Sequence, residues 1–278
     1  MVPYGIKKPD QQGSFLYSMS NFASIIKKLI NAIQPTSFCE IGIDRKVMTQ
    51  TIIDMAKINQ LKIYGIDPTV AEHPLYDNYI LINKSSFTGL DEINACDAYF
   101  IDGDHNYYTA SFELNKINSI PASENYFPLI FIHDIAWPND RRDAYYLPTC
   151  IPSQFLHDYD DRLGVTPEHE DLTPIGIASG NNNYAWRNIR GGDQNGVLTA
   201  VEDFKNKNSQ WNYILIPGIF GLSILYKNSC PDRFIELIAQ LKNAVEWMYE
   251  LISTLEYNRL QLFCEKNQLA SQKKQKRK

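Results

Sequence analysis

Short apolar segments alternate with helical patterns over the first half of the chain. The segments are four or five residues long, which is typical of strands buried in a parallel sheet, and the helical patterns carry apolar residues every three or four positions. The predicted strands are 37–41, 62–66, 79–82, 98–101 and 129–132, and the predicted helices are 20–33, 47–58 and 107–120. Strands that alternate with helices predict a doubly wound sheet with right-handed crossovers.

The pattern changes between residues 135 and 195, where Pro, Gly, Asn, Asp and Tyr prevail. A connection of this length is usually functional, and its many aromatic residues favour an ordered insertion that covers a site. A helix at 196–207 and two strands at 213–216 and 222–226 follow, and the strands would pair as an antiparallel edge. The expected fold is therefore α/β and Rossmann-like, with a mostly parallel seven-stranded sheet, an antiparallel edge and a long insertion after the fifth strand.

A heptad pattern marks the C-terminal part of the chain. Apolar residues alternate at spacings of four and three from Phe234 to Leu262, which predicts a long helix over 231–268. This helix either packs along its own domain or forms a coiled coil with a second copy, as a homodimer. The predicted organisation is an N-terminal segment and helix at 1–35, a main domain at 36–230, the long helix, and a basic disordered tail at 269–278.

Composition narrows the class of protein. The net charge is −5, and basic residues are scattered except at the end, so nothing favours a nucleic-acid partner. The sequence contains no run of about 18 uncharged apolar residues and no basic-then-apolar start, so neither a membrane span nor export is expected and a cytoplasmic protein is predicted. The five cysteines are widely spread and form no CxxC motif, which argues against a disulfide framework and a thiolate zinc site.

The first two predicted strands end in residues suited to a nucleoside. Glu40 and Gly42 follow the first strand, and a missing side chain at Gly42 would let a ligand approach the backbone. One glycine is not the GxGxxG fingerprint for a pyrophosphate, so a cofactor without phosphates fits better. Asp67 ends the second strand 25 residues after Gly42, near the spacing of a ribose-binding carboxylate, although an aspartate before proline is also common in turns.

Polar residues gather after the next two predicted strands. Asp102, Asp104 and His105 follow one strand, and His133 and Asp134 end the other. If the strands are neighbours, these side chains share one edge of the sheet and could hold a divalent ion or move a proton. A helix cap would explain Asp104 alone.

These residues resemble a known family. The sequence Ile101-Asp102-Gly103-Asp104-His105, followed by a strand that ends in two polar residues, is similar to one branch of the class I S-adenosylmethionine-dependent methyltransferases. That branch includes macrolide-sugar and other glycan O-methyltransferases and the cephalosporin-hydroxylase-like proteins. The resemblance covers roughly residues 36–135, with a looser similarity at 195–204, and it implies S-adenosylmethionine as the cofactor.

The resemblance implies a role for each residue at the strand ends. Glu40 and Gly42 would lie at the methionine end of the cofactor, and Asp67 would bind its ribose. Ser86 and Phe87 would lie beside its adenine.

A catalytic centre is implied on the same grounds. Asp102 would contact the cofactor and also bind Mg²⁺ or Mn²⁺ with His133 and Asp134, although an acid usually stands at the position of His133 in metal-dependent members, and a reaction without metal stays open. His105 would be the general base, with Asp104 as a second catalytic residue.

The acceptor is expected to be a sugar or another small-molecule or glycan hydroxyl. Its predicted contacts come from the start of the insertion, at Trp137, Arg141, Arg142 and Tyr145, unless this loop only pairs its charges internally. Two other functions stay open: a non-catalytic module that keeps the fold and binds a partner through the C-terminal helix, and a cephalosporin-hydroxylase-like enzyme.

Overall fold

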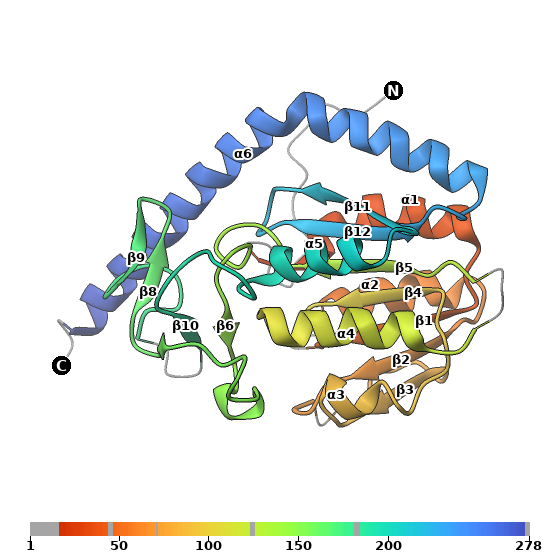
Figure 1. The fold of residues 1–278 in the computed structure, drawn as a ribbon, viewed down its shortest axis with the longest axis horizontal. Helices are drawn as coiled ribbons and strands as arrows, with labels where there is room; N and C mark the ends of the chain where they lie inside the picture. Colours follow the sequence, from red (N-terminus) through yellow and green to blue (C-terminus); the bar gives the residue numbers. More distant parts are fainter. Residues whose placement is uncertain (1–16, 44–46, 71, 123–125, 181–183, 276–278) are drawn as a thin grey trace.

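A seven-stranded sheet forms the centre of the protein (Figure 1). The computed structural model describes residues 17–43, 47–70, 72–122, 126–180 and 184–275. The strand order is β11-β12-β5-β4-β1-β2-β3. The strands are β1 (Ser37–Ile41), β2 (Lys62–Ile66), β3 (Tyr79–Ile82), β4 (Ala98–Ile101), β5 (Leu129–His133), β11 (Trp211–Ile216) and β12 (Leu222–Lys227).

One strand of the sheet runs against the others. β1 to β5 are parallel, whereas β12 pairs antiparallel with both β5 and β11. The order is that of the doubly wound dinucleotide fold with β12 inserted between the fifth strand and the edge. The short turn between β11 and β12 permits an antiparallel pair only, so the predicted hairpin is confirmed. Its reversed strand lies one place in from the edge, and β11 forms the edge itself.

Helices cover both faces of the sheet, which explains why its strands are apolar throughout. On one face α1 (Ala23–Ile33) and α2 (Val47–Lys57) pack against side chains such as Phe38 and Phe131. On the other face α4 (Tyr107–Ser119) and α5 (Val197–Lys207) pack against alternate residues of the same strands, such as Cys39. Two short helices, η1 (Met19–Phe22) and α3 (Ser86–Gly89), complete this part of the chain.

The insertion after β5 is ordered and contains its own small sheets. β6 (Ala144–Tyr145), β10 (Ala185–Arg187) and β7 (Tyr159–Asp160) form a three-stranded sheet, and β8 (Gly164–Thr166) and β9 (His169–Thr173) form a hairpin. A turn of 3-10 helix, η2 (Pro148–Cys150), lies between β6 and β7. These strands are two to five residues long, too short for an alternating pattern to predict them.

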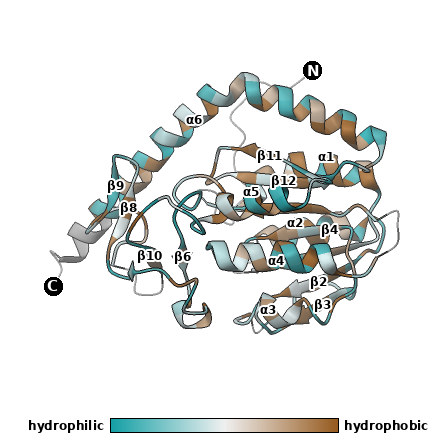
Figure 2. Ribbon diagram, in the orientation of Figure 1, coloured by the Kyte–Doolittle hydropathy of each residue, from teal (hydrophilic) through white to brown (hydrophobic). Residues whose placement is uncertain are grey.

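The last helix, α6 (Asp232–Gln275), has 44 residues and joins the two parts of the molecule (Figure 1). Near its start Phe234 and Ile238 are buried in the core beside α1, and near its end Cys264 packs against β8. Its middle is exposed, with Trp247 91% accessible. Hydrophobic and hydrophilic residues alternate along its length (Figure 2).

The long helix extends beyond its predicted end at residue 268. The Ala, Gln and Lys residues after that position favour a helix, which accounts for the extension to Gln275. Residues 276–278 of the predicted disordered tail lie outside the described residues. The first apolar residues of the predicted heptad pattern, Phe234 and Ile238, pack into the core of the same chain. The homodimer stays a prediction. In the described part of the chain each helix, α6 included, is too short or too polar to cross a membrane.

Candidate functional site

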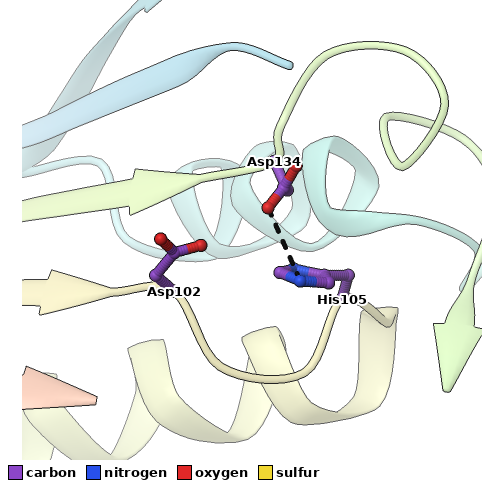
Figure 3. Close-up of side chains that lie close together, drawn as sticks. All are labelled: Asp102, His105 and Asp134. Carbon is purple, nitrogen blue, oxygen red and sulfur yellow. Dashed lines mark ion pairs between the residues drawn. The ribbon is translucent and has the colours of Figure 1, made fainter. Parts of the chain in front are cut away.

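Three side chains meet at the carboxyl edge of the sheet, next to the point where the strand order reverses between β1 and β4 (Figure 3). Asp102 directly follows β4, Asp134 directly follows β5, and His105 lies on the loop that leads from β4 to α4. The neighbouring parallel strands therefore bring together side chains that are about thirty residues apart in sequence. We call these three residues the acidic triad.

The geometry of the acidic triad suits a cation. One ligand atom from each side chain can be chosen so that all three lie within 4.8 Å of one another. His105 Nε2 is 3.5 Å from Asp134 Oδ2, and the His105 side chain is 9% exposed. Two carboxylate oxygens and one imidazole nitrogen are ligands that Mg²⁺ or Mn²⁺ accepts. Asp134 has φ +55°, a left-handed conformation that is sparsely populated outside glycine and concentrates at functional sites.

His133 lies behind the acidic triad. Its Nε2 is 2.9 Å from the Ile219 carbonyl oxygen, so this nitrogen must donate. Its Nδ1 is 3.1 Å from Asp102 Oδ1 and 3.2 Å from Asp134 Oδ2. Burial lowers the His133 pKa, but the two carboxylates outweigh burial and hold the pKa well above its usual value. His105, rather than His133, completes the group of three side chains whose ligand atoms lie close enough together to hold a cation, and a metal contact of His133 stays a prediction.

A cavity of about 260 Å³ opens in front of the acidic triad. Tyr184 forms edge-to-face contacts with Tyr146 and Trp186, each with ring centroids 4.9 Å apart. Aromatic faces of this kind pack against sugar rings and other planar groups. The cavity is lined by Tyr17, Asp102, His105, Asp134, Pro138, Asn139, Tyr146, Ile177, Ala178, Tyr184, Trp186, Phe220 and Phe263.

The predicted acceptor residues Arg141 and Tyr145 do not line this cavity. Arg141 forms a bidentate ion pair with Glu202 of α5, at 2.6 and 2.8 Å. Tyr145 is fully buried and donates to Asp143 Oδ2 at 2.9 Å. Arg141 therefore attaches the insertion to the main domain, whereas the Tyr145 hydrogen bond lies within the insertion. Tyr146, one position further on, reaches the cavity instead.

Trp137 and Arg142, the other two predicted acceptor residues, line a separate cavity of about 200 Å³ within the insertion. Arg142 is 2% exposed and donates to the backbone carbonyl oxygens of Arg187, Asn188 and Glu170. Burial lowers its pKa. These contacts organise the loops of the insertion, and neither residue lines the cavity in front of the acidic triad, so their contact with an acceptor stays a prediction.

Glu40 is also an internal residue. Its Oε1 accepts a hydrogen bond from the Thr49 hydroxyl at 2.8 Å, and its Oε2 accepts one from the Tyr79 hydroxyl at 3.0 Å. The side chain is buried, and burial raises its pKa to about 8. The carboxyl group links β1 to α2 and β3, and the cofactor contact that the resemblance implied for it stays a prediction.

Asp67 occupies the predicted position at the tip of β2 and organises the loops around it. Its Oδ1 accepts from the backbone N–H of Thr69 at 2.7 Å and of Val70 at 3.2 Å, and its Oδ2 accepts from the N–H of Ile43 at 2.9 Å. A carboxylate oxygen can accept two hydrogen bonds, so Oδ2 retains capacity for a ribose hydroxyl.

Gly42 allows the loops after β1 and β4 to contact each other, whereas the sequence suggested that it makes room for a ligand. Its φ is +85°, and a Cβ at this position would lie 2.2 Å from the Asp102 carbonyl oxygen and 2.7 Å from Gly103 Cα. The loops after β1 and β4 can therefore touch at the switch point only because residue 42 has no side chain. This contact fixes the backbone next to Asp102.

The remaining predicted residues surround the same edge. Ser86 begins α3 and is buried, and Phe87 packs against Phe112 with ring centroids 4.9 Å apart. Asp104 is not part of the acidic triad, and its Oδ1 accepts from the N–H groups of His105 and Tyr146, each at 3.1 Å. Burial raises its pKa. Asp104 thus holds the insertion against the β4–α4 loop, and its predicted catalytic role stays a prediction.

Sequence patterns missed several residues at this edge. Asn106, rather than Asp104, caps α4 by accepting from the Thr109 N–H at 2.8 Å. Tyr184 and Phe263 reach the cavity from segments with no motif, and only the aromatic content of the insertion hinted at the first. Glu113 of α4 is also buried, and no sequence pattern marks it.

The fold of this chain is similar to that of several solved structures. No family model matches the chain, and no curated protein matches it. A provisionally named O-methyltransferase of Nostoc punctiforme is 18% identical with a TM-score of 0.45; the match covers 75% of this chain and 56% of that one. The Podospora anserina methyltransferase PaMTH1, solved with S-adenosylhomocysteine, is 12% identical with a TM-score of 0.43, over 76% of this chain and 79% of that one.

Proposed function

We propose that this protein is an S-adenosylmethionine-dependent methyltransferase that methylates a hydroxyl oxygen of a small molecule or glycan, with a divalent cation held by Asp102 and Asp134 and with His105 as the general base. The observation that carries the proposal is the position of the triad: Asp102, His105 and Asp134 form one wall of an aromatic cavity at the edge where doubly wound sheets bind ligands. A sugar hydroxyl is the preferred acceptor, because the aromatic lining provides faces for a sugar ring.

The cofactor would lie over β1, β2 and β4. Asp67 offers Oδ2 to a ribose hydroxyl, and the Ser86–Gly89 helix together with Phe87 lies where the adenine is expected. The segment after β1 has one glycine instead of the GxGxxG pattern that binds a pyrophosphate, which supports a nucleoside without phosphates. The sulfonium would then face the cavity across Asp102.

Methyl transfer requires mainly that two molecules be held in line. The acceptor oxygen forms a bond to the methyl carbon, the bond from carbon to sulfur breaks, and S-adenosylhomocysteine leaves. His105 stands at the cavity wall to take the hydroxyl proton, and Asp134, whose Oδ2 lies 3.5 Å from His105 Nε2, stabilises the resulting imidazolium by its charge. A cation bound to Asp102 and Asp134 would supply Lewis-acid stabilisation of the alkoxide.

Calorimetric titration with S-adenosylhomocysteine tests the proposal directly. We expect micromolar binding, and tighter binding or a second transition when Mg²⁺ or Mn²⁺ replaces EDTA. The control is Asp134→Asn, which should retain S-adenosylhomocysteine binding and lose the response to metal. If the wild-type protein binds no S-adenosylhomocysteine with or without metal, the protein is not such an enzyme, and a non-catalytic module that acts through α6 becomes the better explanation.

A further inference from the structure

A turn with unusual backbone geometry connects β11 and β12. The Gly221 N–H donates to the Gly218 carbonyl oxygen at 2.9 Å, and the two residues between them, Ile219 and Phe220, have φ of +52° and +61°. Positive φ at both central residues is the mark of a type I′ turn, which favours Asn and Gly because they adopt this backbone at low cost. A β-branched and an aromatic residue keep it only where their surroundings hold them there. We call residues 218–221 the hairpin turn.

The hairpin turn is bonded to the residues on both sides of Asp134. The Ile219 carbonyl oxygen accepts from His133 Nε2 at 2.9 Å, and the Phe220 carbonyl oxygen accepts from the Ala136 N–H at 2.7 Å. His133 and Ala136 flank Asp134, whose own φ of +55° is sparsely populated. The position of the Asp134 carboxylate at the cavity therefore depends on the conformation of the hairpin turn.

Helix α6 holds the hairpin turn through an ion pair. The Phe220 N–H donates to Glu256 Oε1 at 2.8 Å, and Arg259 donates to the same carboxylate from Nε at 2.6 Å and from Nη2 at 2.7 Å. The Arg259 guanidinium also lies over the Phe220 ring, 4.5 Å from its centroid. The Glu256 and Arg259 side chains are only 10% and 15% exposed, so water competes little for these charge-assisted bonds. Helix α6 thus supplies the support that the residues of the turn need.

We propose that Glu256 is a positioning residue for the acidic triad: by holding the hairpin turn in its left-handed conformation, it holds Asp134 where that side chain binds the cation. Glu256 does not line the cavity, so it acts through the turn. Residues that orient a metal ligand from behind commonly change metal affinity by about 10- to 100-fold when they are replaced. The inference rests on the proposed function and gives the last helix a part in building the metal site.

Replacing Glu256 with alanine tests the positioning role. The Phe220 N–H loses its charged acceptor, so the hairpin turn can leave its left-handed conformation and displace Asp134. The affinity for Mn²⁺, measured from the electron paramagnetic resonance signal of the free ion, should fall by roughly 10- to 100-fold. The affinity for S-adenosylhomocysteine should not change, because β1, β2 and β4 would hold the cofactor. Glu250→Ala is the matched control, because it removes an exposed carboxylate of the same helix and should change neither affinity.

Two further variants separate positioning from a change of fold or charge. Asn is favoured in type I′ turns, so Ile219→Asn should hold the hairpin turn without the help of α6. In that background Glu256→Ala should lower the Mn²⁺ affinity by a smaller factor than in the wild-type background, which is the coupling that a double-mutant cycle measures. A weakened fold, or the unpaired charge of Arg259, would lower the affinity equally in both. Glu256→Gln keeps an acceptor for the Phe220 N–H, should lose less affinity than Glu256→Ala, and carries the same comparison if thermal melting shows that the alanine variant is unfolded.

The outcomes distinguish the inference from the proposed function. A wild-type protein that binds no Mn²⁺ overturns the metal part of the proposed function and this inference together. Wild-type binding of Mn²⁺ that is unchanged in the Glu256 variants overturns the inference and leaves the proposed function standing. A loss of the same size with and without Ile219→Asn does so as well. A loss that is absent in Glu250→Ala and smaller in the Ile219→Asn background supports the inference.

Discussion

Replacing His105 with glutamine is expected to lower the kcat of methyl transfer by about 10²- to 10⁴-fold, the range of a lost general base. The side chain forms part of the cavity wall and lies 3.5 Å from Asp134, whereas the cofactor would be held by β1, β2 and β4. The affinity for S-adenosylhomocysteine should therefore change little. Initial rates with an accepted hydroxyl substrate and calorimetry on the same preparation measure the two effects separately.

A second histidine provides the matched control for this substitution. His157 lies in the insertion, where its Nε2 contacts the Gln194 carbonyl oxygen at 3.0 Å, and it does not line the cavity. His157→Gln should leave kcat within about twofold of the wild-type value. Equal losses in the two variants, or full activity of His105→Gln, would remove His105 from the role of base.

Replacing Gly42 with alanine is expected to destabilise the protein by about 3 kcal/mol, the sum of left-handed backbone strain and overpacking. The new Cβ would lie 2.2 Å from the Asp102 carbonyl oxygen, a backbone atom that cannot turn away. The β1 and β4 loops would have to separate, and Asp102 would leave its place in the acidic triad. Urea denaturation gives the stability, and metal titration reports the displacement of Asp102.

Gly192 allows backbone strain to be separated from the steric clash. Its φ is +84°, almost that of Gly42, but a Cβ there would meet nothing within 4 Å. Gly192→Ala should therefore cost only about 1 kcal/mol and leave metal binding intact. If the two alanine variants lose the same stability, the contact between the loops carries no energetic weight.

The main sheet was predictable because its strands are buried on both faces. β1, β2, β3 and β4 have the predicted bounds, since each is a continuous apolar segment that ends in a polar residue or glycine. The convergence of Asp102, His105 and Asp134 followed from the parallel order of β4 and β5. Here local pattern and topology agree, which is the condition under which a sequence specifies its fold most plainly.

The functions of individual polar residues were less predictable, because hydrogen-bond partners lie far away in sequence. The Ile219 carbonyl, 86 residues away, fixes the Nε2 atom of His133 as a donor, which no motif at the end of β5 indicates. Arg141 was predicted to contact the acceptor, but in the structure it pairs with Glu202, 61 residues away. A motif shows which groups stand at a strand end, and only packing decides which of them remain free for a ligand.

The cavity wall and the proposed cofactor contacts come from different parts of the sequence, because α6 and the insertion supply much of the wall. The residues proposed to bind the cofactor lie between 67 and 102, whereas much of the cavity wall comes from Pro138, Tyr146, Tyr184 and Phe263. Under the proposed function, replacing the insertion together with the distal turns of α6 is therefore expected to change which acceptor is methylated and to leave cofactor binding in place.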